Sequence, residues 1–163
     1  MVKRGVALGR LLLARGAFVA TAESCTGGLI AKLLTDVAGS SQWFERGLVT
    51  YSNAAKTDLL GVIPEIFETH GAVSEACALA MARGLLVMTP AHYGVAVTGI
   101  AGPGGGTKDK PVGLVWIAWA TRGGKAQARK FRFKGSRAAI RSKSAEAAIA
   151  GLIARLRRGP VNG

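Results

Sequence analysis

The sequence has few residues of the kinds that build disulfide frameworks or metal centres. Its 163 residues include two cysteines, Cys25 and Cys77, and two histidines, His70 and His92. A zinc site needs three or four converging protein ligands, and neither histidine lies in a cluster with metal-ligand spacing. Reduced thiols are the default inside cells. The sequence therefore predicts a protein without a metal site or a cofactor, and without a disulfide framework.

Long uninterrupted apolar runs are also missing, although 49% of the residues are hydrophobic. A transmembrane helix needs about 20 consecutive apolar residues, and the longest candidates, such as 112–120, are broken by glycine or followed by charge. The N-terminus lacks the apolar segment and small-residue cleavage site of a secretory signal. We therefore expect a cytoplasmic protein without a membrane span, folded as one domain over residues 1–163.

Acidic residues are scarce in only one part of the chain. Residues 1–121 hold ten Lys and Arg against eight Asp and Glu, whereas residues 122–163 hold twelve against one, Glu146. The net charge of +13 therefore belongs mostly to the end of the sequence. A basic block of this kind fits nucleic acid, an anionic small molecule or a solvated cationic face.

Hydrophobic periodicity and turn residues divide the chain into helices and strands. We expect helices at 3–15, 27–37, 54–60, 64–70, from Ser74 onward, and at 136–156, and strands at 17–22, 44–52, 93–98, 113–121 and 125–133. The last two strands form a hairpin through 122–124. Because strands and helices alternate first and a hairpin follows, the sequence predicts an α/β fold: a single three-layer domain with a mixed β-sheet flanked by helices.

The turn between the first strand and the second helix carries the first candidate site. In Ala22-Glu23-Ser24-Cys25-Thr26-Gly27-Gly28, Ser24 and Thr26 lie beside a helix N-terminus, where backbone N–H groups are unpaired. The two glycines let a ligand approach the backbone. A serine there can attack a carbonyl whose oxyanion the N–H groups stabilise. Serine and threonine are also the commonest helix N-caps, so the turn alone fits a structural role as well.

The segment after the second strand carries a lysine in an unusual place. In Val49-Thr50-Tyr51-Ser52-Asn53-Ala54-Ala55-Lys56, Asn53 is the expected N-cap and Lys56 falls in the first helical turn. A positive charge is unfavourable beside a helix N-terminus. This position favours a neutral lysine, which can act as general base for a serine. The alternative is an ordinary solvent-exposed lysine.

Two further groups suit an anion. Residues 98–106 follow a strand, and their glycines form either a backbone nest for a phosphate or carboxylate or a flexible surface loop. At the start of the last helix, Arg137 and Arg141 are spaced i,i+4 and can clamp one phosphate. Phe131 and Phe133 alternate like core-facing strand residues, whereas a nucleic-acid platform needs exposed aromatics.

Taken together, these segments resemble the CinA C-terminal domain, the family of PncC-type nicotinamide-nucleotide amidases. The matching stretches follow one order along nearly the whole chain: 22–28, 38–44, 47–56, 70–75, 95–107 and 110–113. The resemblance implies hydrolysis of nicotinamide mononucleotide (NMN) to nicotinate mononucleotide and ammonia, without a metal. Longer CinA proteins carry an additional N-terminal domain, and this chain resembles the stand-alone form.

The resemblance also implies roles for individual residues. Ser24 would be the nucleophile and Lys56 its base, with Tyr51 alongside as a third catalytic residue. The residues expected to bind substrate are Glu23, Thr26, Gly27, Gly28, Asn53, Thr98, Gly99, Gly102, Arg137 and Arg141. Relatives commonly carry Gly-Asp-Arg ahead of the last helix, whereas this chain reads Gly135-Ser136-Arg137, so the acidic residue is absent here.

Two other functions stay open on the sequence alone. The basic end of the chain suits a nucleic-acid-associated accessory protein, whose binding would weaken steeply with salt. A regulatory domain that binds a nucleotide without chemistry is the other alternative. We favour the amidase, with an anionic small molecule as its substrate and nucleic acid as the less favoured partner. We also expect a homo-oligomer, since glycine- and alanine-rich helices leave room for close packing.

Overall fold

A computed structural model describes residues 2–159 of the chain and gives the bounds of its elements. The helices are α1 (Val2–Leu13), α2 (Leu29–Thr35), α3 (Asn53–Leu60), α4 (Pro64–His70), α5 (Glu75–Met88) and α6 (Arg137–Arg157), with a short 3-10 helix at Ser40–Gln42. The strands are β1 (Val19–Glu23), β2 (Phe44–Val49), β3 (Tyr93–Gly99), β4 (Leu114–Thr121) and β5 (Gln127–Arg132). Each helix and strand expected from the sequence is present.

The five strands form one mixed sheet in the order β2-β1-β3-β4-β5. Strand β1 pairs in parallel with both β2 and β3, and its last residue, Glu23, lies opposite Val49 on β2 and Val97 on β3. The β3–β4 and β4–β5 pairs are antiparallel. The predicted mixed α/β sheet is therefore confirmed. Because β1, β2 and β3 run the same way, the segments that follow them meet at one edge of the sheet.

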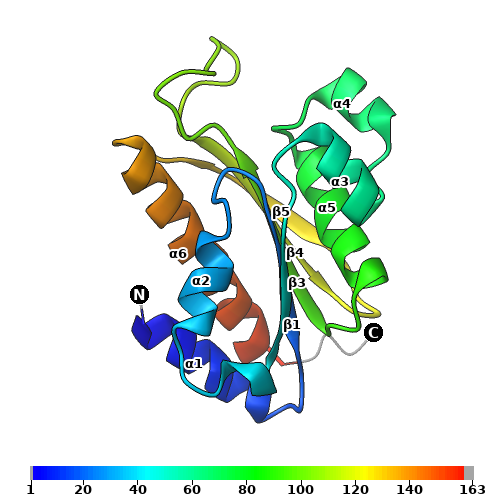
Figure 1. Cartoon of the computed structure of the whole chain (residues 1–163), viewed down its shortest axis with the longest axis vertical. Helices are drawn as coiled ribbons and strands as arrows, with labels where there is room; N and C mark the ends of the chain where they lie inside the picture. The colour runs from blue at the N-terminus through cyan, green and yellow to red at the C-terminus, as the bar shows by residue number, and fades with distance from the viewer. Residues whose placement is uncertain (1, 160–163) are drawn as a thin grey trace.

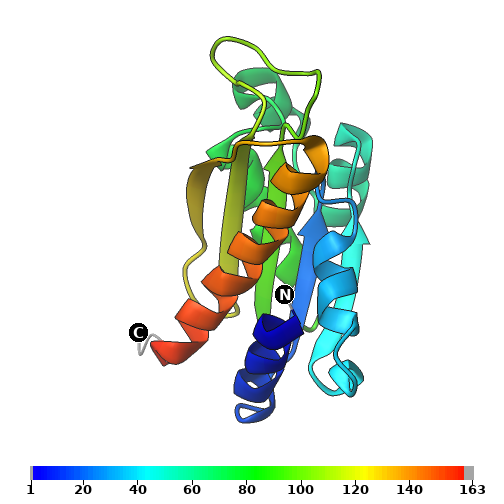
Figure 2. The ribbon, with the colours of Figure 1, turned by 90° about the vertical axis from the view of Figure 1, so that its left-hand side faces the viewer.

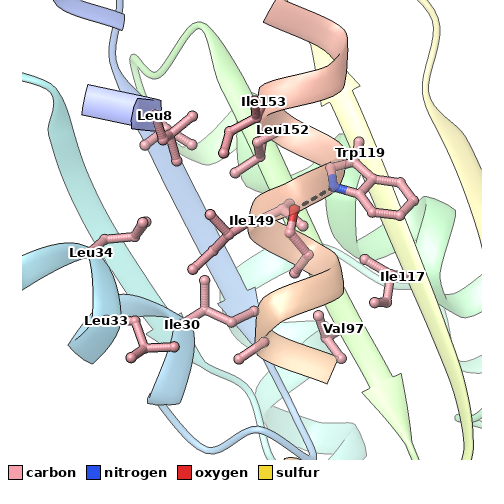
Figure 3. Close-up of a cluster of buried hydrophobic side chains, with 14 of the residues drawn as sticks. Leu8, Ile30, Leu33, Leu34, Val97, Ile117, Trp119, Ile149, Leu152 and Ile153 are labelled. Atoms are coloured by element: carbon pink, nitrogen blue, oxygen red, sulfur yellow. Dashed lines mark hydrogen bonds between the residues drawn. The ribbon is translucent and has the colours of Figure 1, made fainter. Parts of the chain in front are cut away.

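One face of the sheet is covered by α1, α2 and α6, and the other by α3, α4 and α5 (Figures 1 and 2). The first face buries a large aliphatic core in which Ile149 of α6 packs with Ile30 of α2 and Leu8 of α1 (Figure 3). Each such side chain contributes roughly 1.5–3 kcal/mol when fully buried. The indole N–H of Trp119 donates to the carbonyl of Ala148 at 2.9 Å, so this buried donor has a partner.

The second face is packed mainly by α5, which buries Met81 and Leu85 against Ala20 and Ala96 of the sheet. Small residues let α5 and α3 come close. A side chain at Gly84 of α5 would collide with the carbonyl of Leu60 at the end of α3. This close approach fixes α3, the helix that carries Lys56, relative to the sheet.

The helix ends follow the sequence signals with two differences. Ser74 caps α5, and Ser136, placed inside the expected last helix, is the N-cap of α6. For α3 the cap is Ser52 and not Asn53, because Ser52 is the extended residue whose hydroxyl accepts the N–H of Ala55. Helix α2 begins at Leu29 and not at residue 27. Gly27 and Gly28 have φ values of 56° and 95°, and a left-handed backbone cannot belong to a right-handed helix.

Within residues 2–159, the structure contains no helix that is long and apolar enough to cross a membrane.

Candidate active site

The carboxyl edge of the parallel strands brings three loops together. Ser24 follows β1, residues 50–52 follow β2, and residues 100–102 follow β3. The chain leaves β1 toward β2 on one side, while β3 lies on the other. Such a point, where neighbouring strands connect in opposite directions, is where open α/β sheets form their binding crevice. The turn predicted to carry the nucleophile therefore lies at the centre of the sheet edge.

Ser24 and Lys56 are in direct contact at this edge. Nζ of Lys56 lies 3.1 Å from Oγ of Ser24, and both side chains are buried, with 1% of Lys56 and 9% of Ser24 exposed. Nζ also donates to the carbonyls of Thr50 at 2.9 Å and Tyr51 at 3.2 Å. The alternative interpretation of Lys56 as an ordinary solvent-exposed lysine is wrong, because α3 directs this side chain inward.

The surroundings of Lys56 favour its neutral form. Burial lowers the pKa of the Lys56 ammonium, and the nearby thiols of Cys77 and Cys25 oppose this only weakly. Within the described residues no carboxylate forms an ion pair with it. A neutral amine has two N–H groups and one lone pair. The carbonyls of Thr50 and Tyr51 are the nearest acceptors for the two N–H groups, and that of Ser52 lies farther away at 3.5 Å. The lone pair of a neutral amine is then available to the hydroxyl of Ser24 at 3.1 Å.

The pKa of the Cys25 thiol, beside Ser24, is shifted upward, whereas that of Lys56 is shifted downward. Burial raises the pKa of Cys25 to about 11, and the neighbouring Glu23 carboxylate adds to this. A thiol acts as a nucleophile only as thiolate. Near neutral pH, Cys25 is therefore the weaker candidate of the two adjacent residues, and Ser24 is the nucleophile that the geometry favours.

The backbone N–H groups of the turn are mostly engaged. Ser24 N–H donates to the carbonyl of Val97 at 3.0 Å, and Gly27 N–H donates to the carbonyl of Ser24 at 2.9 Å. Gly28 N–H donates to the Glu23 carboxylate. Within residues 2–159 the N–H groups of Cys25 and Thr26 donate to no other residue, and that of Cys25 lies against its own thiol. Two adjacent unpaired donors next to a buried serine are the arrangement that stabilises an oxyanion.

Glu23, expected to bind substrate, caps its own helix. Its carboxylate is 1% exposed and accepts the N–H groups of Gly28, Ile30 and Ala31 at 3.1, 3.0 and 2.8 Å. A carboxylate at this position satisfies the first turn of α2 and interacts favourably with its dipole. The N-terminus of α2 is therefore occupied, so a substrate phosphate cannot use it.

The two arginines of α6 lie on different partners. Arg137 donates to the carbonyl of Gly102 at 2.8 Å and to the phenol oxygen of Tyr51 at 3.0 Å, near the solvent. Arg141 lies one turn deeper and donates to the carbonyls of Cys25 and Thr26. The i,i+4 spacing had suggested that the two guanidinium groups converge on one acceptor. In the structure they bind different acceptors. Ser136, in place of the relatives' acidic residue, is the α6 N-cap, a role that Ser and Asp fill about equally.

The remaining expected site residues, Tyr51, Asn53 and Thr98, differ in their exposure and in their hydrogen-bond partners. Tyr51 is 58% exposed, and among the described contacts its phenol reaches Arg137 but neither Ser24 nor Lys56. Asn53 is exposed on the first turn of α3. Thr98 is buried, and its hydroxyl donates to the carbonyl of Ala72 at 2.8 Å.

Local packing explains why glycine is required at two positions of the 98–106 loop. A side chain at Gly99 would collide with Leu114 and Val115 of β4, and one at Gly102 would collide with Val112. Among the described residues, this loop holds no group of three or more potential metal ligands, and neither does any other part of the structure. Arg137 of α6 donates to the Gly102 carbonyl of this loop at 2.8 Å.

Sequence reasoning missed several backbone groups that build the site. The carbonyls of Thr50 and Tyr51 bind Lys56. Every residue has a backbone carbonyl, so the sequence does not indicate which ones take part in a site. It also missed the buried hydroxyl of Thr50 which, like that of Thr26, has no hydrogen-bond partner within residues 2–159. A threonine near the end of the second predicted strand was the available signal for Thr50. A groove of about 750 Å³ lies away from Ser24 and is lined by β5, α5 and the C-terminal half of α6.

Comparison with known proteins places this geometry in a family. The model of the CinA C-terminal domain matches residues 3–156. The chain belongs to the CinA C-terminal domain family. Nicotinamide-nucleotide amidohydrolase PncC of Escherichia coli (strain K12) is 53% identical over 142 residues, which cover 87% of this chain and 86% of that protein. A CinA-like protein of Akkermansia muciniphila is 52% identical over 142 residues, which cover 87% of this chain and 34% of that longer protein.

Solved structures of CinA proteins share the fold. The competence/damage inducible protein CihA from Agrobacterium tumefaciens superposes with a TM-score of 0.89 at 47% identity, covering 94% of this chain and 95% of that one. The competence damage-inducible protein A from Klebsiella pneumoniae superposes with a TM-score of 0.93 at 37% identity, covering 97% and 98%. The five-stranded mixed sheet is thus the fold of the CinA superfamily.

Proposed function

We propose that this chain hydrolyses the carboxamide of nicotinamide mononucleotide to nicotinate mononucleotide and ammonia. The observation that carries the proposal is the buried contact between Ser24 and Lys56, 3.1 Å apart beside two unpaired backbone N–H groups. The substrate is suggested by the relatives that are named nicotinamide-nucleotide amidohydrolase and are 53% identical to this chain.

The chemistry follows from the protonation state of Lys56. The neutral amine takes the proton of Ser24 as Oγ attacks the carboxamide carbon, and the carbonyl oxygen becomes an oxyanion. The N–H groups of Cys25 and Thr26 stabilise this oxyanion. When the C–N bond breaks, the Lys56 ammonium gives its proton to the departing nitrogen, which leaves as ammonia. The nicotinoyl group is then an ester on Ser24.

A water molecule completes the cycle. Lys56, neutral again, takes a proton from this water as it attacks the ester carbonyl. Collapse of the second tetrahedral intermediate returns the proton to Ser24 Oγ and releases the carboxylate product. One lysine therefore serves as base and as acid in both half-reactions, and no metal takes part in any step.

Arg137 is the residue we assign to the substrate phosphate. Its guanidinium lies at the exposed end of the site, between Tyr51 and Gly102, and the other basic residues of that region add to a positive potential. A guanidinium binds phosphate oxygens bidentately. The exposed phenol ring of Tyr51 offers a π face to the cationic pyridinium ring of the substrate.

Replacing Ser24 by alanine tests the proposal directly. Ammonia release from NMN should fall to background in Ser24→Ala, while the circular dichroism spectrum and Tm stay close to those of the wild type. Ser41→Ala, which removes an exposed hydroxyl from the short 3-10 helix, is the matched control and should keep full activity. Full retention of activity in Ser24→Ala would overturn the mechanism, and an inactive wild type would overturn the function.

The proposal includes the wider setting of the enzyme. We infer that it works as one domain over residues 1–163, as a homo-oligomer and in the cytoplasm. Sedimentation velocity at several protein concentrations tests the association, and fractionation of cells that express the chain tests the compartment.

A further inference from the structure

Arg141 reaches the catalytic turn from a helix more than a hundred residues away in sequence. Its side chain is half-buried. Nε donates to the carbonyl of Cys25 at 3.2 Å, and Nη2 donates to the carbonyl of Thr26 at 2.9 Å. Gly27 leaves room for this approach, because a side chain there would begin 3.2 Å from Nη2. Two of the three guanidinium nitrogens are therefore committed to the protein backbone.

The carbonyls that Arg141 binds belong to the peptide units around the unpaired donors. The carbonyl of Cys25 and the N–H of Thr26 lie in the same planar peptide group, so a hydrogen bond that fixes one also fixes the direction of the other. The preceding peptide, which contains the N–H of Cys25, is fixed in the same way, because its carbonyl accepts from Gly27. Each free N–H thus has its own peptide plane held from the opposite side.

The charge of Arg141 also strengthens the donor. A hydrogen bond to a carbonyl from an ionised group polarises the peptide, and hydrogen bonds in such a chain reinforce one another.

We propose that Arg141 is a positioning residue that orients and polarises the Thr26 N–H as an oxyanion donor, and that it does not bind the substrate phosphate. This inference rests on the proposed Ser24 mechanism and deepens it. It replaces the expectation of a phosphate clamp made of Arg137 and Arg141, and it divides their tasks: Arg137 holds substrate and Arg141 holds the turn.

Measurement of kcat and of NMN affinity separates these two roles. In Arg141→Met, kcat with NMN should fall by about tenfold to a hundredfold, somewhat less than the loss of an oxyanion donor itself. The Kd for NMN, measured by calorimetry in the Ser24→Ala background, should stay unchanged. Arg137→Met should show the reverse, with a raised Kd. Arg157→Met, which removes an exposed charge from the same helix, is the control and should change neither.

An ester without phosphate gives an independent readout. The burst of p-nitrophenol from p-nitrophenyl acetate needs Ser24, Lys56 and the oxyanion donors, but no recognition of a nucleotide. Arg141→Met should slow this acylation by about the same factor as it lowers kcat, and the control Arg157→Met should leave it unchanged. Arg141→Lys keeps the charge but not the fork of two donors, and it should fall between wild type and Arg141→Met, which also covers the case in which the methionine variant does not fold.

The outcomes are distinct for this inference and for the proposed function. A raised Kd for NMN with unchanged kcat and burst in Arg141→Met would establish a phosphate contact and overturn the positioning role. A wild type that gives the burst but releases no ammonia from NMN would overturn the proposed function, while the burst still tests Arg141. A wild type without either activity would overturn both.

Discussion

Two basic side chains, Lys56 and Arg122, each bind several backbone carbonyls at opposite edges of the sheet, and they serve different purposes. Lys56 at the carboxyl edge donates to Thr50 and Tyr51 and touches Ser24. Arg122 at the other edge donates to the carbonyl of Ala91 at 2.9 Å and to those of Leu86 and Thr89 at 2.5 Å. Both fasten loops to the sheet, but only the lysine can lose its proton at accessible pH.

The difference lies in burial and in chemistry. Lys56 is 1% exposed and its amine is a compact group whose pKa falls on burial. Arg122 lies at the surface, with a guanidinium that is always protonated. The buried Lys56, held by carbonyls, can act as a general base. Arg122 makes the same kind of contact but serves as a structural link between α5, β3 and β4.

The largest effect should come from removing Lys56. Lys56→Met should lower kcat/KM for NMN by on the order of 10⁴- to 10⁶-fold, because nucleophile and base act as a unit. The variant should fold, since methionine fills a similar volume without a buried charge. A coupled ammonia assay gives the rate, and Arg122→Met, the same substitution at the other edge, should keep the wild-type rate. A Lys56→Met variant with near wild-type turnover would remove the lysine from the mechanism.

The next effect concerns pH. Burial lowers the pKa of folded Lys56 below its ordinary value of 10.5, so between these two values the unfolded chain binds a proton that the folded chain does not. The free energy of unfolding should therefore rise with pH across that window, and kcat/KM should rise to a plateau as the neutral amine forms.

Urea unfolding and turnover, measured at the same series of pH values, check this prediction. Subtracting the profile of Lys56→Met from that of the wild type isolates the contribution of this lysine, and the difference should grow with pH. Arg122→Met should keep the wild-type pH dependence. A flat difference between wild type and Lys56→Met would mean that the amine keeps its ordinary pKa.

The smallest effect is on stability at the opposite edge. Arg122→Met should lower the free energy of unfolding by about 1–2 kcal/mol, since the carbonyls it held can turn to water. For a chain of this length that corresponds to a Tm lower by a few degrees. Differential scanning calorimetry gives the Tm. A loss of turnover together with an unchanged Tm would show that the two edges are coupled.

The sequence predicted the elements and most helix ends because those signals are local. Ser74, Gly61 and Pro64 lie within one turn of the helix end they mark. The Ser24–Lys56 pair was predicted from the position of Lys56 in the first turn of a helix and from the resemblance to the CinA family. In the fold the two residues meet because the segments after the parallel strands β1 and β2 lie at one edge of the sheet. Asn53 was chosen as cap over Ser52 because both residue types cap well, and one residue of offset decides which hydroxyl or amide reaches the third N–H.

The direction of side chains could not be predicted in the same way. A carboxylate beside a nucleophile fits substrate binding as well as capping, and only the folded turn shows Glu23 directed back to Ile30 and Ala31. The i,i+4 spacing of Arg137 and Arg141 places them on one face of α6, but their acceptors come from other parts of the chain. The basic block of residues 122–163 likewise divides once folded, since Arg155 stacks on Trp119 at 4.2 Å, far along α6 from Arg137.

The direction of α6 has a consequence for how this domain can be joined to others. The helix begins beside the Ser24 turn and runs down the sheet to the edge where α1 also lies (Figure 1). The start of α1 lies beside the middle of α6, where Arg4 contacts Glu146, whereas the last turn of α6 lies at the end of the molecule remote from Ser24. Sequence attached after the last turn of α6 therefore starts far from Ser24. A fused domain, tether or surface anchor placed there leaves the approach to Ser24 open, so the domain can be joined into a longer chain without blocking its site.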